Sequence, residues 1–222
     1  MKKAVVLFSG GKDSCLALHK SRKKFDLIGL ATILPKNFDS FMFHKPYENL
    51  LEKQAEMLGL KLIVQKSSGV EEEELDDLKK LFDLIKKMGA EVVVIGGIAS
   101  NYQGDRIKKI ASDFDLEIYA PLWNYTPEKL WGELFDNKFE IIFTKVSCDG
   151  LTKNWVGVKI DDEKFMTLKK LSEKYKFKLD LEGGEAESAV LNMPGFEKRI
   201  EISFRIKSEG EHRHWIEGLR VL

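Results

Sequence analysis

The stretch Ser9-Gly10-Gly11-Lys12-Asp13-Ser14 joins two segments with different periodicities. Residues 4–8 (AVVLF) form a continuous apolar run with β-branched side chains, which is typical of a buried strand. Residues 15–20 (CLALHK) carry apolar side chains at helical spacing. The six residues are therefore predicted to form a strand-to-helix turn, the connection that recurs in α/β proteins.

The residue types in this turn favour an anion-binding site. Gly10 and Gly11 allow tight backbone geometry and a close approach of a ligand to the main chain. The start of the following helix offers N–H groups without helical partners and the positive end of the helix dipole. Lys12 adds a positive charge, and Ser9 and Ser14 add hydroxyl donors, so the turn is predicted to bind phosphate.

A simpler interpretation of the turn stays open. Asp13 or Ser14 is able to cap the helix without any ligand being involved, as these residue types commonly do. The turn is not a Walker A loop, because the spacing G-x-x-x-x-G-K-S/T is absent.

Strand and helix signals alternate through the first half of the chain. Strands are expected near residues 27–34, 60–64, 91–95 and 116–119, and helices near residues 14–24, 48–58, 71–88 and 104–114. This alternation predicts an α/β fold with a doubly wound parallel sheet. Glycine pairs at 10–11 and 96–97 follow the first and fourth strands, which are expected to flank the point where the strand order reverses.

The pattern changes after Pro121. Thr126 followed by Pro127 indicates a helix start, and further elements are expected at 140–146 (strand) and 161–175 (helix). Two alternating segments, 199–206 and 214–219, flank a turn at Glu209-Gly210 and predict a β-hairpin. We expect an ATP-binding domain over residues 1–124 and a smaller α+β substrate-binding domain over residues 125–222.

Composition narrows the class of protein. The chain has 222 residues, with 36 Lys plus Arg and 36 Asp plus Glu, so its net charge is zero, whereas dedicated nucleic-acid binders are usually basic. Cys15 and Cys148 form neither a disulfide framework nor a zinc motif, which favours a reducing compartment. The five-residue apolar run near the N-terminus is too short for a signal peptide or a membrane helix, so we expect a cytoplasmic protein without membrane contact.

Residues 180–188 (DLEGGEAES) place three glutamates, Glu182, Glu185 and Glu187, around a glycine pair. One interpretation is a solvated turn that leads into a strand at residues 189–191. The other is a set of carboxylates that face a cation, either Mg²⁺ or an ammonium nucleophile. The residue types alone leave both open.

Several segments carry a family resemblance. SGGKDS at the end of a first strand resembles the PP-loop of the N-type ATP pyrophosphatases. The segment Glu182-Gly183-Gly184-Glu185, followed by Glu187 and Ser188, resembles a late motif of one branch, the diphthine–ammonia ligases. Further similarities to that branch are Met42-Phe43-His44, Gly97 to Gln103 with Arg106, and Pro121-Leu122-Trp123. Together these matches run from residue 9 to residue 188.

The resemblance implies a HUP-like PP-loop ATPase fold and an ATP-dependent carbon–nitrogen ligase. Such an enzyme converts diphthine, a modified histidine on translation elongation factor two, to diphthamide with ammonia. The reaction passes through an acyl-adenylate and releases AMP and pyrophosphate, with ATP and Mg²⁺ as the implied cofactors. Cys15 is expected to be packed in the first helix, no glutaminase machinery is evident, and free ammonia is thus the expected nitrogen donor.

The resemblance also implies residue roles. Nucleotide binding is expected of Ser9, Gly10, Gly11, Lys12, Asp13, Ser14, Ala31, Thr32, Gly96 and Gly97. Substrate binding is expected of His44, Ser100, Tyr102, Gln103, Arg106, Trp123, Glu182, Gly183, Gly184 and Glu185. Catalytic roles are expected of Lys12, Asp13, Glu185 and Glu187. Asp13 is the candidate Mg²⁺ ligand, and an aromatic face is expected to recognise the trimethylammonium group of diphthine.

Two other functions are compatible with a PP-loop. The first is a tRNA-modifying adenylating enzyme, which the lack of a cysteine pair and the zero net charge disfavour. The second is a non-catalytic ATP-binding sensor, which the intact SGGKDS and the acidic segment disfavour. An exposed edge in the C-terminal hairpin would allow two chains to pair as a homodimer.

Overall fold

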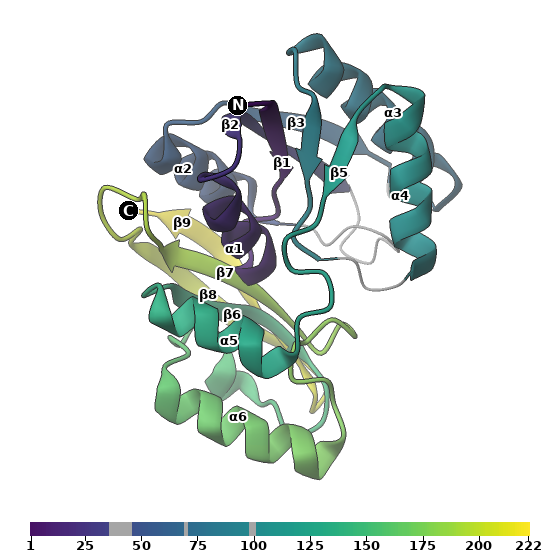
Figure 1. Ribbon diagram of the computed structural model, residues 1–222. Helices are drawn as coiled ribbons and strands as arrows, with labels where there is room; N and C mark the ends of the chain where they lie inside the picture. Colours follow the sequence, from purple (N-terminus) through teal and green to yellow (C-terminus); the bar gives the residue numbers. More distant parts are fainter. Residues whose placement is uncertain (36–45, 69–70, 98–100) are drawn as a thin grey trace. The chain divides into compact units, whose positions relative to one another are not determined.

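The computed structural model describes residues 1–35, 46–68, 71–97 and 101–222, apart from the side chains of 71–74 and 101–106 (Figure 1). The described residues form two compact units. The first consists of Met1–Ser9 and Asp13–Trp123, and the second of Asn124–Leu222 together with Gly10–Lys12. Each unit is built around a sheet of its own.

The first unit contains a parallel five-stranded sheet in the order β3-β2-β1-β4-β5. Its strands are β1 (Lys3–Leu7), β2 (Asp26–Pro35), β3 (Leu62–Ser67), β4 (Val92–Val94) and β5 (Glu117–Tyr119). The order confirms the predicted doubly wound sheet. Because β1 and β4 are neighbours, they flank the point of reversal, which is where open α/β sheets bind ligands.

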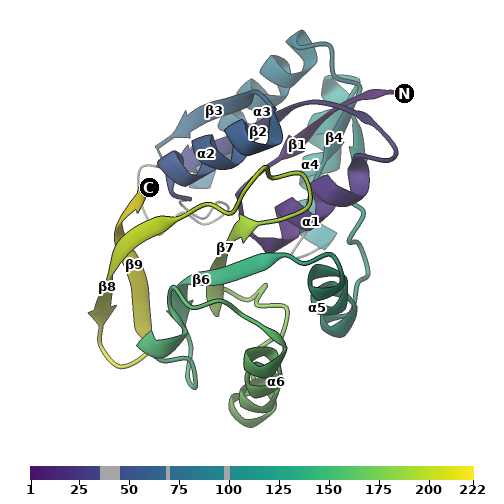
Figure 2. The same cartoon turned by 90° about the vertical axis from the view of Figure 1, so that its left-hand side faces the viewer.

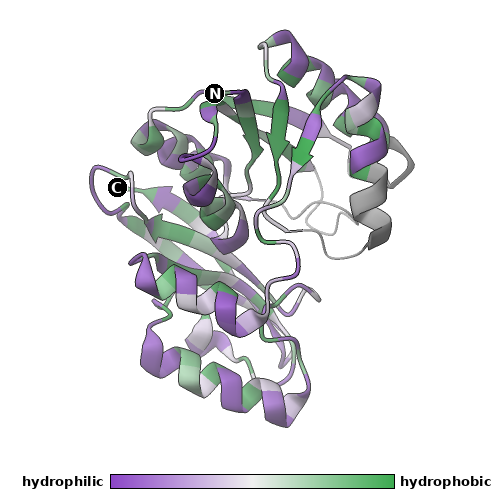
Figure 3. Ribbon diagram, in the orientation of Figure 1, coloured by the Kyte–Doolittle hydropathy of each residue, from purple (hydrophilic) through white to green (hydrophobic). Residues whose placement is uncertain are grey.

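Helices cover both faces of this sheet. They are α1 (Lys12–Ser21), α2 (Glu48–Leu58), α3 (Glu71–Lys87) and α4 (Asn101–Asp113). Figures 1 and 2 show α1 and α2 on one side and α3 and α4 on the other, as right-handed crossovers require when the strand order reverses. The inner strands are apolar (Figure 3), and on the α3 side they bury a core that includes Val5, Ile33, Phe82, Val93 and Ile110.

Strand β2 is longer than its sequence pattern indicates. It was expected near residues 27–34 and continues one residue further, to Pro35, with the residues from Thr32 onward paired with β3. Ala31 is the partner of Leu7, the last residue of β1, and its carbonyl accepts a hydrogen bond from Phe8 N at 2.8 Å. Ala31 and Thr32 therefore lie inside β2, level with the point where β1 ends.

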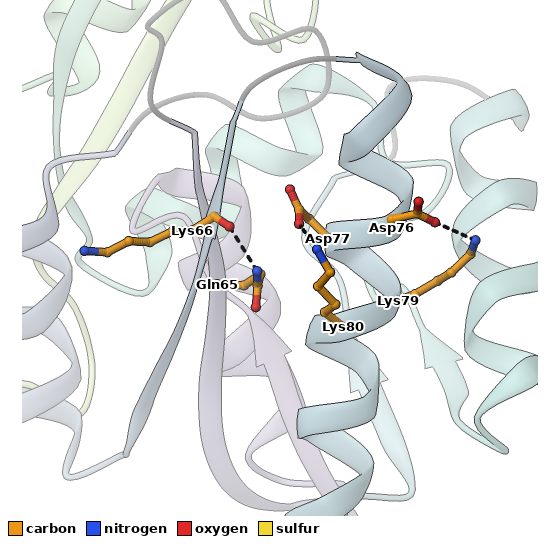
Figure 4. Close-up of polar contacts among 6 residues, drawn as sticks. All are labelled: Gln65, Lys66, Asp76, Asp77, Lys79 and Lys80. Carbon is orange, nitrogen blue, oxygen red and sulfur yellow. Dashed lines mark hydrogen bonds and ion pairs between the residues drawn. The ribbon is translucent and has the colours of Figure 1, made fainter.

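Helix α3 confirms that the acidic run after residue 70 is helical. Asp76 and Lys79 are paired at 2.8 Å and Asp77 and Lys80 at 3.0 Å, each three residues apart on the helix (Figure 4). To the left of the helix in Figure 4, the side-chain amide of Gln65 on β3 donates to the main-chain carbonyl of Lys66. The two ion pairs on α3 are of the kind that stabilises a helix by a few tenths of a kcal/mol each. Among the described helices, none combines the length and apolar character needed to cross a membrane.

The second unit has an antiparallel sheet in the order β7-β6-β9-β8. Its elements are α5 (Pro127–Asp136), β6 (Glu140–Ser147), the 3₁₀ turn η1 (Lys153–Trp155), α6 (Asp162–Tyr175), β7 (Ala186–Asn192), β8 (Ile202–Glu209) and β9 (Arg213–Val221). This confirms the smaller α+β part of the predicted fold and the C-terminal hairpin. Strand β8 forms one edge of the sheet, and pairing of two chains along it stays a prediction.

Helix α5 is defined by a cap at its start and by a buried tryptophan on the face that packs into the second unit. Thr126 caps the helix by accepting a hydrogen bond from Lys129 N at 3.3 Å, and Pro127 occupies the first turn, as predicted. Trp131 is fully buried, and its indole N–H donates to the Leu179 carbonyl at 3.0 Å. Because the polar edge of the indole is satisfied, the ring can be buried without leaving a donor unpaired.

Candidate functional site

The predicted anion-binding turn lies between β1 and α1. Gly10 has a φ of 73°, a conformation that glycine adopts without steric cost. Ser9 N donates to Ser14 Oγ at 3.3 Å, and the two hydroxyl oxygens are 3.2 Å apart. Ser14 is buried and Asp13 is half-buried in the first turn of α1. These contacts hold the two serines at opposite ends of the turn close to each other.

The second glycine turn packs against the start of α1. A Cβ atom placed on Gly96 would lie 2.6 Å from both Asp13 C and Ser14 N, closer than real Cβ atoms come to other heavy atoms. Only glycine therefore permits this approach of the β4 turn to the helix. Gly97 follows and is exposed. Gly96, at the end of β4, thus lies directly against the first turn of α1.

Residues Gly10–Lys12 belong to the second unit, where two hydrogen bonds connect them to β7. Lys12 N donates to Ser188 Oγ at 3.1 Å, and Val190 N donates to the Gly10 carbonyl at 3.0 Å. Lys12 itself is buried, with 3% of its surface exposed. Ser188 follows the acidic motif in the sequence, and no binding role was predicted for it. These contacts show that it lies beside the glycine turn.

The acidic turn is organised by the carboxylate of Glu185. Its two oxygens accept hydrogen bonds from Gly183 N at 2.8 Å and Lys178 N at 3.1 Å. Nearby, Glu182 N donates to Asp180 Oδ1 at 3.1 Å, and Gly184 has a φ of 86°. These bonds support the interpretation of this segment as a structured turn. Substrate or catalytic roles for its glutamates stay predictions.

Glu187 lies in a strand and not in a turn. Strand β7 begins at Ala186, three residues earlier than the sequence pattern indicated, because β6 supplies partners for this stretch. The carboxylate of Glu187 pairs with Lys145 Nζ at 3.0 Å, and the two side chains are 18% and 19% exposed. Lys145 was missed at the sequence level. The available signal was a lone charge in the otherwise uncharged middle of EIIFTKVS.

A β-bulge in β6 creates this pairing. Phe143 lies opposite Ser188, whereas Lys145 lies opposite Glu187, so the buried Thr144 is the extra residue. Successive residues of a strand point to opposite faces, so Glu187 and Ser188 diverge on β7. Glu187 pairs with Lys145, and Ser188 accepts the hydrogen bond from the amide of Lys12.

The remaining residues predicted to bind substrate lie partly outside the described part of the chain. His44 and Ser100 lie outside the described residues, and Tyr102, Gln103 and Arg106 belong to α4 with side chains outside the description. Trp123 follows β5 and is 40% exposed, and Lys108 Nζ lies 5.4 Å from the centroid of its ring. A lysine ammonium thus already lies near the face of this candidate aromatic residue.

Within the described ranges, no cluster of three or more His, Cys, Asp or Glu side chains is arranged to hold a metal ion. Mg²⁺ commonly binds through one or two carboxylates and the phosphates of a substrate, so a complete protein cage is not needed. Asp13, half-buried beside the glycine turn, has the donor chemistry for such a ligand and stays the candidate.

The two cysteines do not have the environment of a reactive thiol. Cys15 is fully buried in α1, as expected, and burial strongly raises its pKa. The pKa of Cys148 is raised to about 11, first by burial and then by the negative charges of Glu185 and Asp149. Both thiols are therefore protonated near neutral pH, which disfavours chemistry that needs a cysteine nucleophile.

This environment predicts slow alkylation of Cys148. Because its raised pKa favours the neutral thiol, iodoacetamide at pH 8 should modify it roughly a hundredfold more slowly than an unfolded-chain cysteine. The rate should rise about tenfold per pH unit between pH 7 and 9, well below the raised pKa. Mass spectrometry of the native protein measures the rate, and the urea-unfolded chain is the control. Equal rates in the two states would contradict the prediction.

A second prediction concerns the Lys145–Glu187 pair. Lys145→Met should lower the free energy of unfolding by about 1–3 kcal/mol, between the values for exposed and buried pairs, because Glu187 loses its lysine partner. The double variant Lys145→Met/Glu187→Gln should lose less than the sum of the two single variants. Urea unfolding provides the values. The exposed Lys79→Met is the matched control and should change stability by less than about 0.5 kcal/mol, and additive losses would show that the pair does not interact.

Comparison with known families extends these observations to the whole chain. A family model described as the diphthamide synthase N-terminal domain matches residues 1–117, which contain the glycine turn and Gly96. A second, the diphthamide synthase C-terminal domain, matches residues 126–220, which contain the acidic segment and Lys145. The chain belongs to the diphthamide synthase family. The Lys145–Glu187 pair and the Lys12–Ser188 bond are thus contacts within a diphthamide synthase fold.

Relatives of this diphthamide synthase family member carry the name diphthine–ammonia ligase. That of Schizosaccharomyces pombe is 32% identical over 220 residues, which are 89% of this chain and 36% of that protein. That of Rattus norvegicus is 30% identical over 218 residues, 89% of this chain and 82% of that protein. The chain spans about a third of the length of the two yeast relatives. Among solved structures, a Methanocaldococcus jannaschii protein described as a subunit of tRNA methyltransferase covers 90% of this chain at 15% identity, with a TM-score of only 0.44.

Proposed function

We propose that this chain is an ATP-dependent ligase that converts diphthine on translation elongation factor two to diphthamide with ammonia. The observation that carries the proposal is the glycine turn between β1 and α1, closed by Gly96 at the point where the strand order reverses. Its helix N-terminus suits the phosphates of a nucleotide. The names of the relatives supply the acceptor and the nitrogen donor.

The proposed chemistry proceeds in two steps. An oxygen of the diphthine carboxylate attacks the α-phosphorus of ATP, the bond to the β-phosphate oxygen breaks, and pyrophosphate leaves. The product is an acyl-adenylate. Its AMP group leaves readily, whereas the oxygen of a free carboxylate is a poor leaving group. Ammonia then attacks the carbonyl carbon, AMP leaves, and the surplus proton passes to a base, which gives the amide.

The glycine turn suits the phosphate side of this reaction. The left-handed Gly10, the start of α1 and the hydroxyls of Ser9 and Ser14 offer donors for phosphate oxygens. Lys12 would offset the charge that develops on pyrophosphate as it leaves. Asp13 would hold Mg²⁺ together with the phosphates. Around them, Gly11, Ala31, Thr32, Gly96 and Gly97 would line the nucleotide.

The acidic segment and the aromatic residues are proposed for the acceptor. Its trimethylammonium group is a cation that suits carboxylates and aromatic faces, so the candidates are Tyr102, Trp123, Glu185 and Glu187. Glu185 and Glu187 are the candidates that orient ammonia or accept its proton, and the carboxylate of Glu187 pairs with Lys145 Nζ at 3.0 Å. Substrate binding is proposed as well for His44, Ser100, Tyr102, Gln103 and Arg106. We also propose that the protein is cytoplasmic.

The test is a reconstituted reaction. The purified chain is mixed with ATP, MgCl₂, ammonium chloride and elongation factor two that carries diphthine, and the modified histidine is followed by mass spectrometry. We expect the small mass decrease that accompanies replacement of a hydroxyl group by an amino group, together with an equal amount of AMP. Omitting ammonium or ATP should abolish the change.

Other outcomes would redirect the assignment. AMP without a change on elongation factor two would retain adenylation and remove diphthine as the acceptor. A gel shift with tRNA that weakens steeply with salt would then favour the tRNA-modifying alternative. No AMP at all, with a related ligase active under the same conditions, would favour an ATP-binding sensor.

A further inference from the structure

The residue before α1 is a glycine, which has no side chain that could cap the helix. The first N–H groups of a helix have no helical partners, and they are usually satisfied by the side chain of the preceding residue. Here the preceding residue is Gly11, which has no side chain. The amide of Lys12 instead donates to Ser188 Oγ at 3.1 Å, although the two residues are 176 positions apart. Ser188 thus provides at long range what a local capping residue would provide.

A second bond ties the other end of the same turn to the same strand. Val190 N donates to the Gly10 carbonyl at 3.0 Å. Ser188 and Val190 are two residues apart on β7 and therefore face the same way. The segment Gly10–Lys12 is held at its first residue by a main-chain bond and at its last by the serine hydroxyl. This segment and β7 belong to the same compact unit.

We infer that Ser188 is a positioning residue for the nucleotide-binding turn, an inference that rests on the proposed nucleotide role of that turn. Its bond fixes the peptide plane between Gly11 and Lys12. That plane sets the directions of the neighbouring N–H groups and of the buried Lys12 side chain. Donors that are oriented before a ligand arrives bind it more tightly, because less conformational freedom is lost on binding.

The neighbouring glutamate provides a contrast on the same strand. Glu187 points to the opposite face, where it meets Lys145. A change at Ser188 should therefore affect nucleotide binding, whereas the Lys145–Glu187 pair should not respond directly. A serine hydroxyl accepts the Lys12 N–H while keeping its own proton as a donor, and threonine has the same capacity whereas alanine has neither.

The test measures binding of a non-hydrolysable ATP analogue, α,β-methylene-ATP, by isothermal titration calorimetry with the full chain and Mg²⁺. We expect Ser188→Ala to weaken binding about tenfold, the effect of one hydrogen bond that orients a charged site. Ser188→Thr, which keeps the hydroxyl, should stay within about threefold of wild type. Ser203→Ala, on the exposed part of β8, is the matched control and should bind as wild type does.

The outcomes separate this role from a purely structural one. If Ser188→Ala only lowers Tm and binds the analogue with wild-type affinity well below Tm, the inference is overturned. The same holds if Ser188→Thr is as weak as Ser188→Ala, or if the wild type does not bind the analogue. Binding requires no diphthine, so a wild type that binds the analogue in a Ser188-dependent manner but forms no amide would overturn the proposed function and leave the inference standing.

Discussion

Replacing Gly96 with alanine should lower the free energy of unfolding by about 2 kcal/mol or more and weaken binding of an ATP analogue at least about tenfold. The added Cβ would lie 2.6 Å from Asp13 C and Ser14 N. Both are main-chain atoms at the start of α1, so no flexible side chain can move aside. Relief of the clash must displace either the β4 turn or the first turn of the helix that is proposed to face the phosphates.

Gly132→Ala is the matched control for this variant. Gly132 lies within α5, and a Cβ built on it meets nothing within 4 Å. Alanine should therefore stabilise the protein by roughly 0.5–1 kcal/mol, because it restricts the unfolded chain and favours the helix. Urea unfolding followed by circular dichroism provides both values. If Gly96→Ala behaves like Gly132→Ala, the close approach of β4 to α1 is not present in solution.

Lys12→Met should reduce the rate of AMP formation about 10²–10³-fold, the range measured when one stabilising donor is removed from an active site. Lys12 is 3% exposed, so its ammonium group acts where water screens charge weakly. Methionine fills a similar volume without the charge. The loss is expected mainly in kcat, because the charge on pyrophosphate increases as it leaves.

Lys23→Met, an exposed lysine just beyond the end of α1, is the control and should retain wild-type rates. The rates are measured as AMP released at saturating ATP, by chromatography of quenched samples. Circular dichroism checks that Lys12→Met is folded. A folded Lys12→Met with the wild-type rate would remove Lys12 from the proposed mechanism, even if the amide product still forms.

The sequence predicted the parts of the fold that depend on local pattern. Apolar runs and helix signals located the elements, and the glycine pairs at 10–11 and 96–97 identified the two strands at the point of reversal. Glycine is informative here because its role is steric and local: one residue takes a positive φ, and another leaves no room for a Cβ. Thr126 was predicted to start a helix and does cap α5, because helix capping is likewise a local effect.

Features that depend on strand pairing were missed. The early start of β7 at Ala186 arises from its pairing with β6, so periodicity within the segment itself cannot reveal it. The partnership of Lys145 with Glu187 depends on a one-residue bulge. The bond from Lys12 to Ser188 joins residues that no local motif connects. For the candidate site, the sequence supplied the residue types but not their partners.

The divergence of Glu187 and Ser188 on β7 restricts how this segment can be redesigned. Because side chains alternate along a strand, adding or deleting one residue between Ser188 and Val190 would exchange the faces of the two side chains relative to the rest of β7 while leaving both residue types in the chain. A library that randomises residue identities here would sample useful variants. A library that varies segment length would turn the carboxylate toward the glycine turn and the hydroxyl toward Lys145, so residue count is the quantity that an engineer has to preserve.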